Sequence, residues 1–146
     1  MRVAIGSDHG GYSLKEKIKA YLTSQHVDVV DYGTNSNESV DYPEYGEKVG
    51  HAIVGGGFDF GIVLCGTGIG ISIAANKVKG VRAALVYDEN TARLAKEHNN
   101  ANIIALGGRT TTYENAISII NTFMQATFES RHQKRLDKIT SIEGKE

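Results

Sequence analysis

Cys65 is the chain's only cysteine, and it stands between an apolar run and a glycine-rich turn. A thiol at the start of a helix loses its proton more readily than a free thiol. Cys65 is therefore a candidate nucleophile or proton-transfer group. A buried cysteine with a packing role alone would fit the same position.

The turn after Cys65 does not match the common nucleotide or phosphate-ester loops. A P-loop needs Gly-Lys-Ser/Thr after its glycines, and a dinucleotide fingerprint needs a third glycine where this chain has Ile71 or Ile73. A phosphatase-like Cys-x5-Arg loop would need arginine at position 71. What remains is a strand-to-helix turn whose backbone N–H groups converge on an anion.

Two histidine-containing pairs offer proton transfer and hydroxyl recognition. Asp8 and His9 precede a Gly-Gly pair, and His98 and Asn99 follow a helical pattern. The simpler interpretation is turn capping by Asp8 and a favourable helix-dipole position for His98. The sequence by itself leaves both interpretations open.

Three arginines could bind a phosphate group. Arg109 follows a Gly-Gly pair, and Arg131 and Arg135 lie four residues apart, on one face of a helix. The same spacing is also typical of a solvated helix surface. We expect no metal site, because the histidines show no His-x3-His spacing and no recognisable ligand cluster with carboxylates.

Short apolar runs alternate with helical patterns along the chain, as expected for strands buried on both faces. The runs cover residues 3–6, 27–31, 61–65, 83–87 and 103–107. Helices are predicted to begin at the capping-box spacing of residues 13–16, at Pro43, within residues 66–70 and at residues 91 and 113. The order predicts a Rossmann-like α/β/α sandwich around a five-stranded parallel sheet, a single domain spanning residues 1–146.

Right-handed crossovers place every strand-to-helix loop at one edge of such a sheet, where ligands bind. Residues 129–146 are polar and predict a C-terminal helical arm. The helix predicted over residues 113–128 is apolar on more than one side. It is either a subunit interface or a well-buried helix.

Composition excludes several classes of protein. The 16 Lys and Arg against 17 Asp and Glu give a net charge of −1, which disfavours nucleic-acid binding. The longest uncharged run, residues 60–76, is interrupted by glycines and is shorter than the roughly 20 apolar residues of a membrane span. A lone cysteine cannot form an internal disulfide, so we expect a reducing, cytoplasmic location.

The chain resembles the ribose-5-phosphate isomerase B family, which includes ribose, allose and galactose phosphate isomerases of this type. The resemblance spans essentially the whole chain. It rests on Ser-Asp-His-Gly-Gly at 7–11, Asp-Tyr-Pro at 41–43, Cys-Gly-Thr-Gly-Ile-Gly-Ile-Ser-Ile-Ala-Ala-Asn-Lys at 65–77, His-Asn at 98–99, Gly-Gly-Arg at 107–109, and Arg-His-x-x-Arg at 131–135.

This resemblance implies aldose–ketose isomerisation of a sugar phosphate through an enediolate, without metal or cofactor, in the non-oxidative pentose phosphate pathway. It also implies a homodimer with active sites shared between subunits, or a tetramer built from such dimers. Cys65 would carry a proton between C1 and C2 of the open-chain sugar. Some relatives use a carboxylate several residues later instead, and residues 71–75 contain none.

The resemblance assigns the other roles residue by residue. His98 and Asp8 would open the furanose ring, and Asn99 would bind hydroxyls or the enediolate. The enediolate oxygens would lie against Gly66, Thr67, Gly68, Ile69 and Gly70. The phosphate would be bound by His9, Arg109, Arg131 and Arg135. Asp41 and Tyr42 would line the site.

The substrate is the open part of this interpretation. Allose 6-phosphate and galactose 6-phosphate isomerases share the scaffold, and the galactose enzymes contain two different subunits. A chain that holds Cys65, Thr67 and His98 together fits the ribose enzyme better. A non-catalytic sugar-phosphate-binding module or a regulatory subunit would need the anion-binding turn, but no base and no ring-opening acid.

Overall fold

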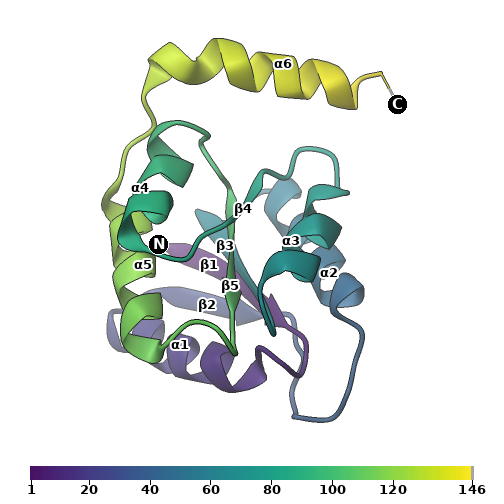
Figure 1. Cartoon of the computed structure of the whole chain (residues 1–146), viewed down its shortest axis with the longest axis vertical. Helices are drawn as coiled ribbons and strands as arrows, with labels where there is room; N and C mark the ends of the chain where they lie inside the picture. The colour runs from purple at the N-terminus through teal and green to yellow at the C-terminus, as the bar shows by residue number, and fades with distance from the viewer. Residues whose placement is uncertain (146) are drawn as a thin grey trace.

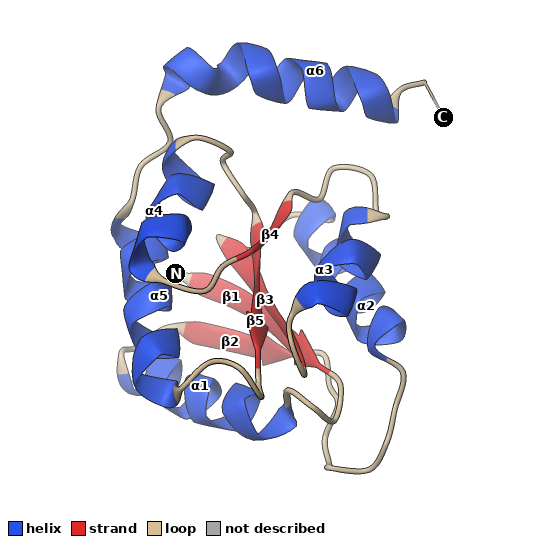
Figure 2. Ribbon diagram, in the orientation of Figure 1, coloured by secondary structure: helices blue, strands red, loops and turns tan. Residues whose placement is uncertain are grey.

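The computed structural model describes residues 1–145 and shows five parallel strands between two layers of helices (Figure 1). The sheet order is β2-β1-β3-β5-β4. Figure 2 shows the strands at the centre and helices on both sides. The strands are β1 (Arg2–Ser7), β2 (Asp28–Asp31), β3 (Phe60–Cys65), β4 (Ala83–Leu85) and β5 (Ile103–Gly107). The predicted α/β sandwich is confirmed.

The three central strands are the predicted apolar runs, and their side chains are buried on both faces. Ile5 of β1 pairs with Ile62 of β3, and Val63 pairs with Ala105 of β5. Strand β4 ends at Leu85, two residues before the predicted end, and lies half-exposed at the sheet edge. Burial of apolar surface on both sheet faces is the main stabilising contribution to this fold.

Helices cover both faces of the sheet, with three on one face and two on the opposite face. One core cluster joins α1 (Tyr12–Ser24), α4 (Glu89–Glu97) and α5 (Tyr113–Gln125) to the sheet. The other joins α2 (Tyr42–Val54) and α3 (Ile69–Asn76) to the opposite face. Each strand-to-helix turn therefore lies at the carboxyl edge of the sheet, as predicted.

Two predicted helix starts are wrong by a few residues. The capping box expected at residues 13–16 does not form, because α1 already begins at Tyr12 after Gly11. A capping box forms instead at α4, where Asp88 and Thr91 bond reciprocally, so that helix begins at Glu89 rather than at Thr91. Residue spacing alone allowed each helix to begin at its predicted position. In each case the backbone conformation of the preceding loop sets the actual start of the helix.

Helix α5 is shorter than predicted and is covered within the chain. It ends at Gln125, and Ala116, Ile119, Ile120 and Phe123 are buried against the sheet. The simpler interpretation, a well-buried helix, accounts for its apolar residues. The exposed apolar side chains lie on other elements, mainly Ile69 and Ile73 of α3, Leu85, Tyr87, and two residues of the C-terminal arm.

The predicted arm is confirmed as far as residue 145, and residue 146 lies outside the described part of the chain. It consists of a 3-10 turn, η1 (Ser130–His132), and helix α6 (Gln133–Glu143). Figure 1 shows α6 lying across the top of the molecule, apart from the two helical layers. Ile139 and Ile142 on this helix are exposed.

A buried ion pair ties α1 to the edge strand β2. The fully buried Lys15 places its Nζ 2.6 Å from Asp31 Oδ2, and Lys19 Nζ lies 2.7 Å from the same oxygen. Burial raises the pKa of Asp31, but the hydrogen bonds from the two lysines and from Gly33 N–H outweigh it, so the net shift is downward.

None of the helices among residues 1–145 has the length and apolar character needed to cross a membrane.

Candidate active site

Main-chain hydrogen bonds join the turns after the three central strands. Gly108 N–H donates to the carbonyl oxygen of Cys65 over 2.8 Å, and Arg109 N–H donates to that of Gly66 over 2.9 Å. Asp8 N–H donates to the carbonyl of Leu64 over 3.2 Å. The turns after β1, β3 and β5 therefore form one connected unit at the carboxyl edge.

Close backbone approach explains the glycines in this unit. A Cβ on Gly107 would lie 2.9 Å from the carbonyl carbon of Thr67, and one on Gly108 would collide with the carbonyl oxygen of Gly10. Gly68 has a φ of 81°, in the left-handed region that other residues rarely adopt. The sequence clusters of glycine thus mark the places where three loops meet.

Cys65 lies at the centre of the connected turns. Its side chain is buried, and Gly68 N–H donates to Sγ over 3.2 Å, just before the first residue of α3. The sulfur thus lies beside a backbone N–H donor at the amino end of α3, inside the connected turns. This contact supports the chemical interpretation of Cys65 over a purely packing role.

The residues around the sulfur present hydrogen-bond donors and a cation. Thr67 is exposed, and its Oγ1 accepts from Ile69 N–H over 3.2 Å. The Arg109 guanidinium lies against the Cys65 turn, with Nη1 3.2 Å from the Cβ position of Gly66. An anion bound here would meet both backbone donors and a fixed positive charge.

Asp8 and His9 lie in the neighbouring turn. Asp8 is buried, and its Oδ1 accepts from Gly11 N–H over 3.2 Å, as the capping interpretation expects. His9 Nδ1 accepts from Val40 N–H over 3.1 Å, so the neutral ring carries its proton on Nε2. This bond anchors the long loop that leads to Asp41.

Asp41 and Tyr42 approach the site from the start of α2. Asp41 is the residue before the helix, without a side-chain capping bond. The Tyr42 ring stands over α3, with Cε1 and Cζ 2.7 Å from the Cβ position of Gly70. We call the residues at this edge the carboxyl-edge group, which comprises Asp8, His9, Asp41, Tyr42, Cys65, residues 66–70 and Arg109.

The remaining predicted residues form a second cluster, the arm-side group, which comprises His98, Asn99, Arg131 and Arg135. His98 ends α4, and Arg131 and Arg135 lie on η1 and α6. Glu129 N–H donates to the carbonyl of Glu97 over 2.9 Å, which holds the start of the arm against the end of α4.

The centre of the arm-side group is a pair of stacked imidazoles. The ring centroids of His98 and His132 lie 4.3 Å apart, with a tilt of 39° between the rings. Arg135 Nη1 lies 3.2 Å from His132 Nδ1, and Arg131 Nε donates to Glu129 Oε2 over 2.8 Å. Burial, followed by the positive charge of Arg131, lowers the pKa of His132, which favours the neutral ring at pH 7.

One chain does not bring the two groups together. Cys65 pairs with Gly107 at the end of β5, whereas His98 comes before Ile103, where that strand begins. The four steps between those ends of β5 correspond to about 13 Å. In Figure 1 the chain leaves β5 near the bottom of the molecule, while the arm lies at the top.

Sequence reasoning named His132 only within the motif Arg-His-x-x-Arg and gave it no role, and it did not single out Glu129. Their Glu-x-x-His spacing puts two polar side chains on one side of a helical turn, and this was the available signal. The contact with His98 depends on the path of residues 126–129, which carries no such pattern. Tertiary structure alone brings the three side chains together.

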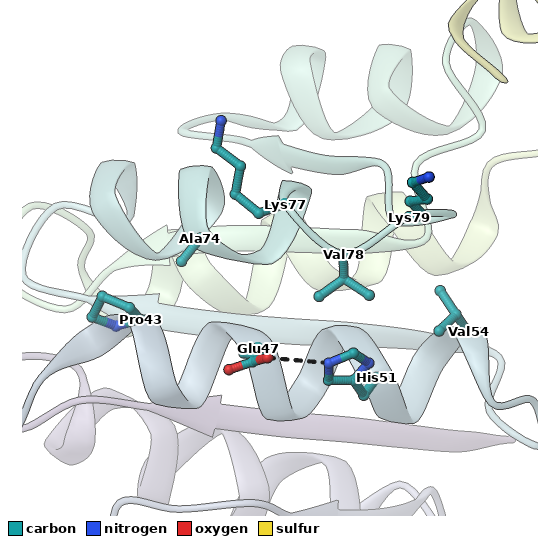
Figure 3. A pocket seen from close by; sticks show the side chains of 8 residues that line it. All are labelled: Pro43, Glu47, His51, Val54, Ala74, Lys77, Val78 and Lys79. Atoms are coloured by element: carbon teal, nitrogen blue, oxygen red, sulfur yellow. Dashed lines mark hydrogen bonds and ion pairs between the residues drawn. The ribbon is translucent and has the colours of Figure 1, made fainter. Parts of the chain in front are cut away.

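A cavity of about 600 Å³ between α2 and α3 lies apart from both groups (Figure 3). Val54, Ala74 and Val78 form apolar parts of its wall, and Glu47 and His51 pair across 3.2 Å at its rim. None of its lining residues belongs to the predicted site. We therefore take the carboxyl-edge and arm-side groups as the candidate active site.

Comparisons with known proteins agree on one family. The family model described as Ribose/Galactose Isomerase matches residues 3–139. Ribose-5-phosphate isomerase B of Escherichia coli K12 is 45% identical over 143 residues, covering 97% of this chain and 96% of that protein.

Solved structures agree as well. The ribose-5-phosphate isomerase B of Clostridium thermocellum superposes with a TM-score of 0.97 at 51% identity, covering 99% of both chains. The enzyme from Mycoplasma genitalium, solved with bound ribulose 5-phosphate, gives a TM-score of 0.93 at 42% identity and covers 99% of this chain and 97% of that one. The family suggested by the glycine turn and its flanking motifs is thus confirmed, and this chain belongs to the ribose/galactose isomerase family.

Proposed function

We propose that this chain is a ribose-5-phosphate isomerase of type B, which interconverts D-ribose 5-phosphate and D-ribulose 5-phosphate. The observation that carries the proposal is the position of Cys65. Its buried sulfur accepts a backbone N–H at the start of α3, inside a glycine turn. Membership of the family and 45% identity to the E. coli enzyme over nearly the whole chain support the same activity.

Cys65 acts as the base in this mechanism. Its thiolate removes the proton from C2 of the open-chain aldose, and the C–H electrons form a C1=C2 bond while O1 takes the negative charge. A proton then passes from O2 to O1, and the thiol returns its proton to C1 as the C2 carbonyl forms. Atoms and electrons balance within the sugar and one thiol, so the protein residues are unchanged at the end.

The glycine turn stabilises the enediolate. We assign the enediolate oxygens to the backbone N–H groups of residues 66–70 and to the Thr67 hydroxyl. Without substrate, Gly68 N–H donates to Sγ and Ile69 N–H donates to Thr67 Oγ1, so these two groups would exchange partners when the sugar binds. Donors held by a folded main chain need no reorganisation when the negative charge develops, so they lower the barrier. The connected turns around Cys65 provide that rigidity.

Binding of the phosphate positions the reacting carbons. We assign the phosphate to His9, Arg109, Arg131 and Arg135, and we assign ring opening to His98 with Asp8. Asn99 binds sugar hydroxyls or the enediolate, while Asp41 and Tyr42 line the site. Contacts remote from C1 and C2 contribute to catalysis by fixing these atoms against Cys65.

These assignments require two copies of the chain, because the two groups lie at opposite edges of one sheet. We therefore propose a homodimer in which the arm-side group of one protomer completes the carboxyl-edge group of the other. Exposed apolar side chains are available on both sides, with Ile69 and Ile73 on α3 after the glycine turn and Ile139 on α6 of the arm. Further pairing of dimers into tetramers would leave this arrangement intact.

The wider context follows from the same proposal. Residues 1–146 act as one catalytic domain in which residues 129–146 are the arm. The lone free cysteine fits a reducing, cytoplasmic compartment. A pentose phosphate substrate places the enzyme in the non-oxidative pentose phosphate pathway.

The decisive experiment follows ribulose 5-phosphate formation from ribose 5-phosphate with excess EDTA present. We expect turnover of the pentose and much weaker turnover of allose 6-phosphate and galactose 6-phosphate. Activity on a hexose phosphate alone would keep the mechanism and change the substrate. Thermal stabilisation by ribose 5-phosphate without conversion would instead indicate a binding module.

A further inference from the structure

We propose that His98, Glu129 and His132 form a binding site for a divalent transition metal of the zinc class. Each side chain offers one ligand atom, and these atoms all lie within 4.8 Å of one another. Two imidazoles and one carboxylate, with a fourth position open to water, are a common zinc ligand set. The site lies on the arm side, away from Cys65 of the same chain.

Only small movements would bring the ligands to coordination distance. Zinc lies about 2.0–2.2 Å from nitrogen and oxygen ligands, so tetrahedral neighbours are about 3.3 Å apart. His98 and Glu129 are only partly buried, which leaves their side chains room to rotate. Glu129 uses Oε2 for Arg131, and its carboxylate has a second oxygen available as a ligand.

A second observation points independently to a ligand at this place. His132 is only 7% exposed, and its buried Nε2 has no hydrogen-bond partner among the residues that the structure describes. An unpaired buried polar atom destabilises the folded protein, so a group that pairs with it is bound more tightly. A metal ion or its bound water would satisfy that nitrogen.

Arg135 opposes the metal and so provides a specific test. Its guanidinium can only donate, so the contact with His132 Nδ1 keeps that nitrogen unprotonated and leaves the proton of the neutral ring on Nε2. A metal on Nε2 needs the proton moved to Nδ1, and a metal on Nδ1 needs that position vacated. In either case Arg135 must leave the ring, and it is exposed enough to do so.

The ligand types select the metal. Imidazole nitrogen favours Zn²⁺, Ni²⁺ and Cu²⁺, whereas Mg²⁺ and Ca²⁺ prefer oxygen ligands alone. Under the proposed function, the metal would inhibit the isomerase, because it would occupy the ring of His98. That consequence rests on the proposed function, whereas the binding site itself does not.

The test measures zinc binding directly on the intact, chelator-treated protein, with ZnCl₂ in competition with a chromophoric chelator. We expect one zinc ion per chain and no competition from equal Mg²⁺. His132→Gln and Glu129→Gln should each weaken binding by at least the roughly 10–100-fold seen when outer contacts of a metal site are removed. Arg135→Gln should tighten binding, since glutamine can accept from Nδ1–H and removes the positive charge.

Two matched variants exclude other zinc ligands. Cys65→Ala removes the only thiol, and His51→Gln removes a ring nitrogen that lies 3.2 Å from Glu47 Oε2. Neither should change zinc affinity. Loss of binding in either variant, absence of binding in the wild type, or weaker binding in Arg135→Gln would overturn the proposal.

Two further readouts separate the possible failures. Because His132 is buried, circular dichroism must show that His132→Gln folds, and the partly exposed Glu129→Gln supplies an independent answer if it does not. Zinc should inhibit isomerisation over the concentration range in which it binds. Binding without any isomerase activity would reject the proposed function and keep the metal site, whereas activity without binding would do the reverse.

Discussion

The carboxyl-edge group and the arm-side group are held in place in different ways. Backbone hydrogen bonds and glycine contacts fix the turns around Cys65, and a buried side chain lies at their centre. The arm-side group consists of side chains at the end of α4 and on the arm, and Arg131 and Arg135 are exposed. One chain thus holds hydrogen-bond donors at the sheet edge and presents exposed cations on the arm.

In the proposed homodimer, this difference would divide the catalytic roles between two protomers. A base and an oxyanion site need fixed geometry, because small displacements of reacting groups cost much of the rate. The proposed base and enediolate site are built into the carboxyl edge of the sheet, whereas Arg131 and Arg135, which we assign to the phosphate, are carried on the arm.

The largest expected effect comes from removing the base in the carboxyl-edge group. Cys65→Ala should reduce kcat by roughly 10²–10⁴-fold, the usual contribution of a positioned proton-transfer group. Steady-state assays of ribulose 5-phosphate formation measure this loss. Thermal stabilisation by ribose 5-phosphate should persist, since the phosphate contacts remain. Turnover at the wild-type rate would reject Cys65 as the base.

The next prediction joins the two groups across protomers. His98→Asn should lower kcat on the closed ring form by about 10²-fold, the lower end for a proton-transfer group. Mixing refolded Cys65→Ala and His98→Asn chains should restore about a quarter of wild-type activity, because half of the dimers are mixed and each has one intact site. No recovery on mixing would place both residues in a site within one chain.

The sequence predicted the sheet well and the site only as a set of residues. Buried parallel strands are nearly continuous apolar runs, so β1, β3 and β5 were visible as such. A helix that leaves the carboxyl edge of a sheet ends at the amino edge, and this topology separates His98 from Cys65. The sequence analysis grouped His98 with Cys65 by residue type, whereas the direction of α4 places the two residues at opposite ends of the strands.

The stacked histidines could not have been predicted in the same way. Their contact depends on how residues 126–129 turn back onto the end of α4, and irregular backbone has no period to read. The predicted start of α1 was wrong for a related reason. Asp8 closes the turn before the helix through Gly11, so the spacing at residues 13–16 never acts as a cap.

A charged residue at the end of strand β2 and one at the start of the arm should differ in their effect on the free energy of unfolding. Asp31→Asn leaves the fully buried Lys15 with only the 3.6 Å contact to Glu16 Oε2, and we expect a cost of up to about 3–5 kcal/mol. Glu129→Gln breaks an exposed pair with Arg131, and we expect no measurable change in the free energy of unfolding. Urea unfolding of both variants beside the wild type makes the comparison. Equal losses would show that burial of Lys15 does not set the cost.

Glycine substitutions compare how tightly the backbone is packed in the connected turns and on the arm. Gly107→Ala places a Cβ against the Thr67 backbone and Thr110 Oγ1, and we expect a loss of about 1–3 kcal/mol from overpacking, together with a fall in kcat. Gly144→Ala on the arm has space, with its nearest neighbour 3.6 Å away, and serves as the control. A neutral Gly107→Ala would mean that the connected turns relax freely.

The smallest expected effect is the pH dependence carried by Asp31. Its pKa is lowered on folding from an ordinary 3.8, so its stabilising contribution is complete above that value. The contribution is lost as the pH falls through 3.8 toward the folded pKa, because the unfolded chain then binds more protons than the folded one. Urea midpoints measured from pH 6 downward should fall more steeply in the wild type than in Asp31→Asn. If the two plots of urea midpoint against pH are parallel, other carboxylates cause the acid sensitivity of the fold. The ion pair between α1 and β2 would then contribute to packing at that edge of the sheet but not to the pH dependence of stability.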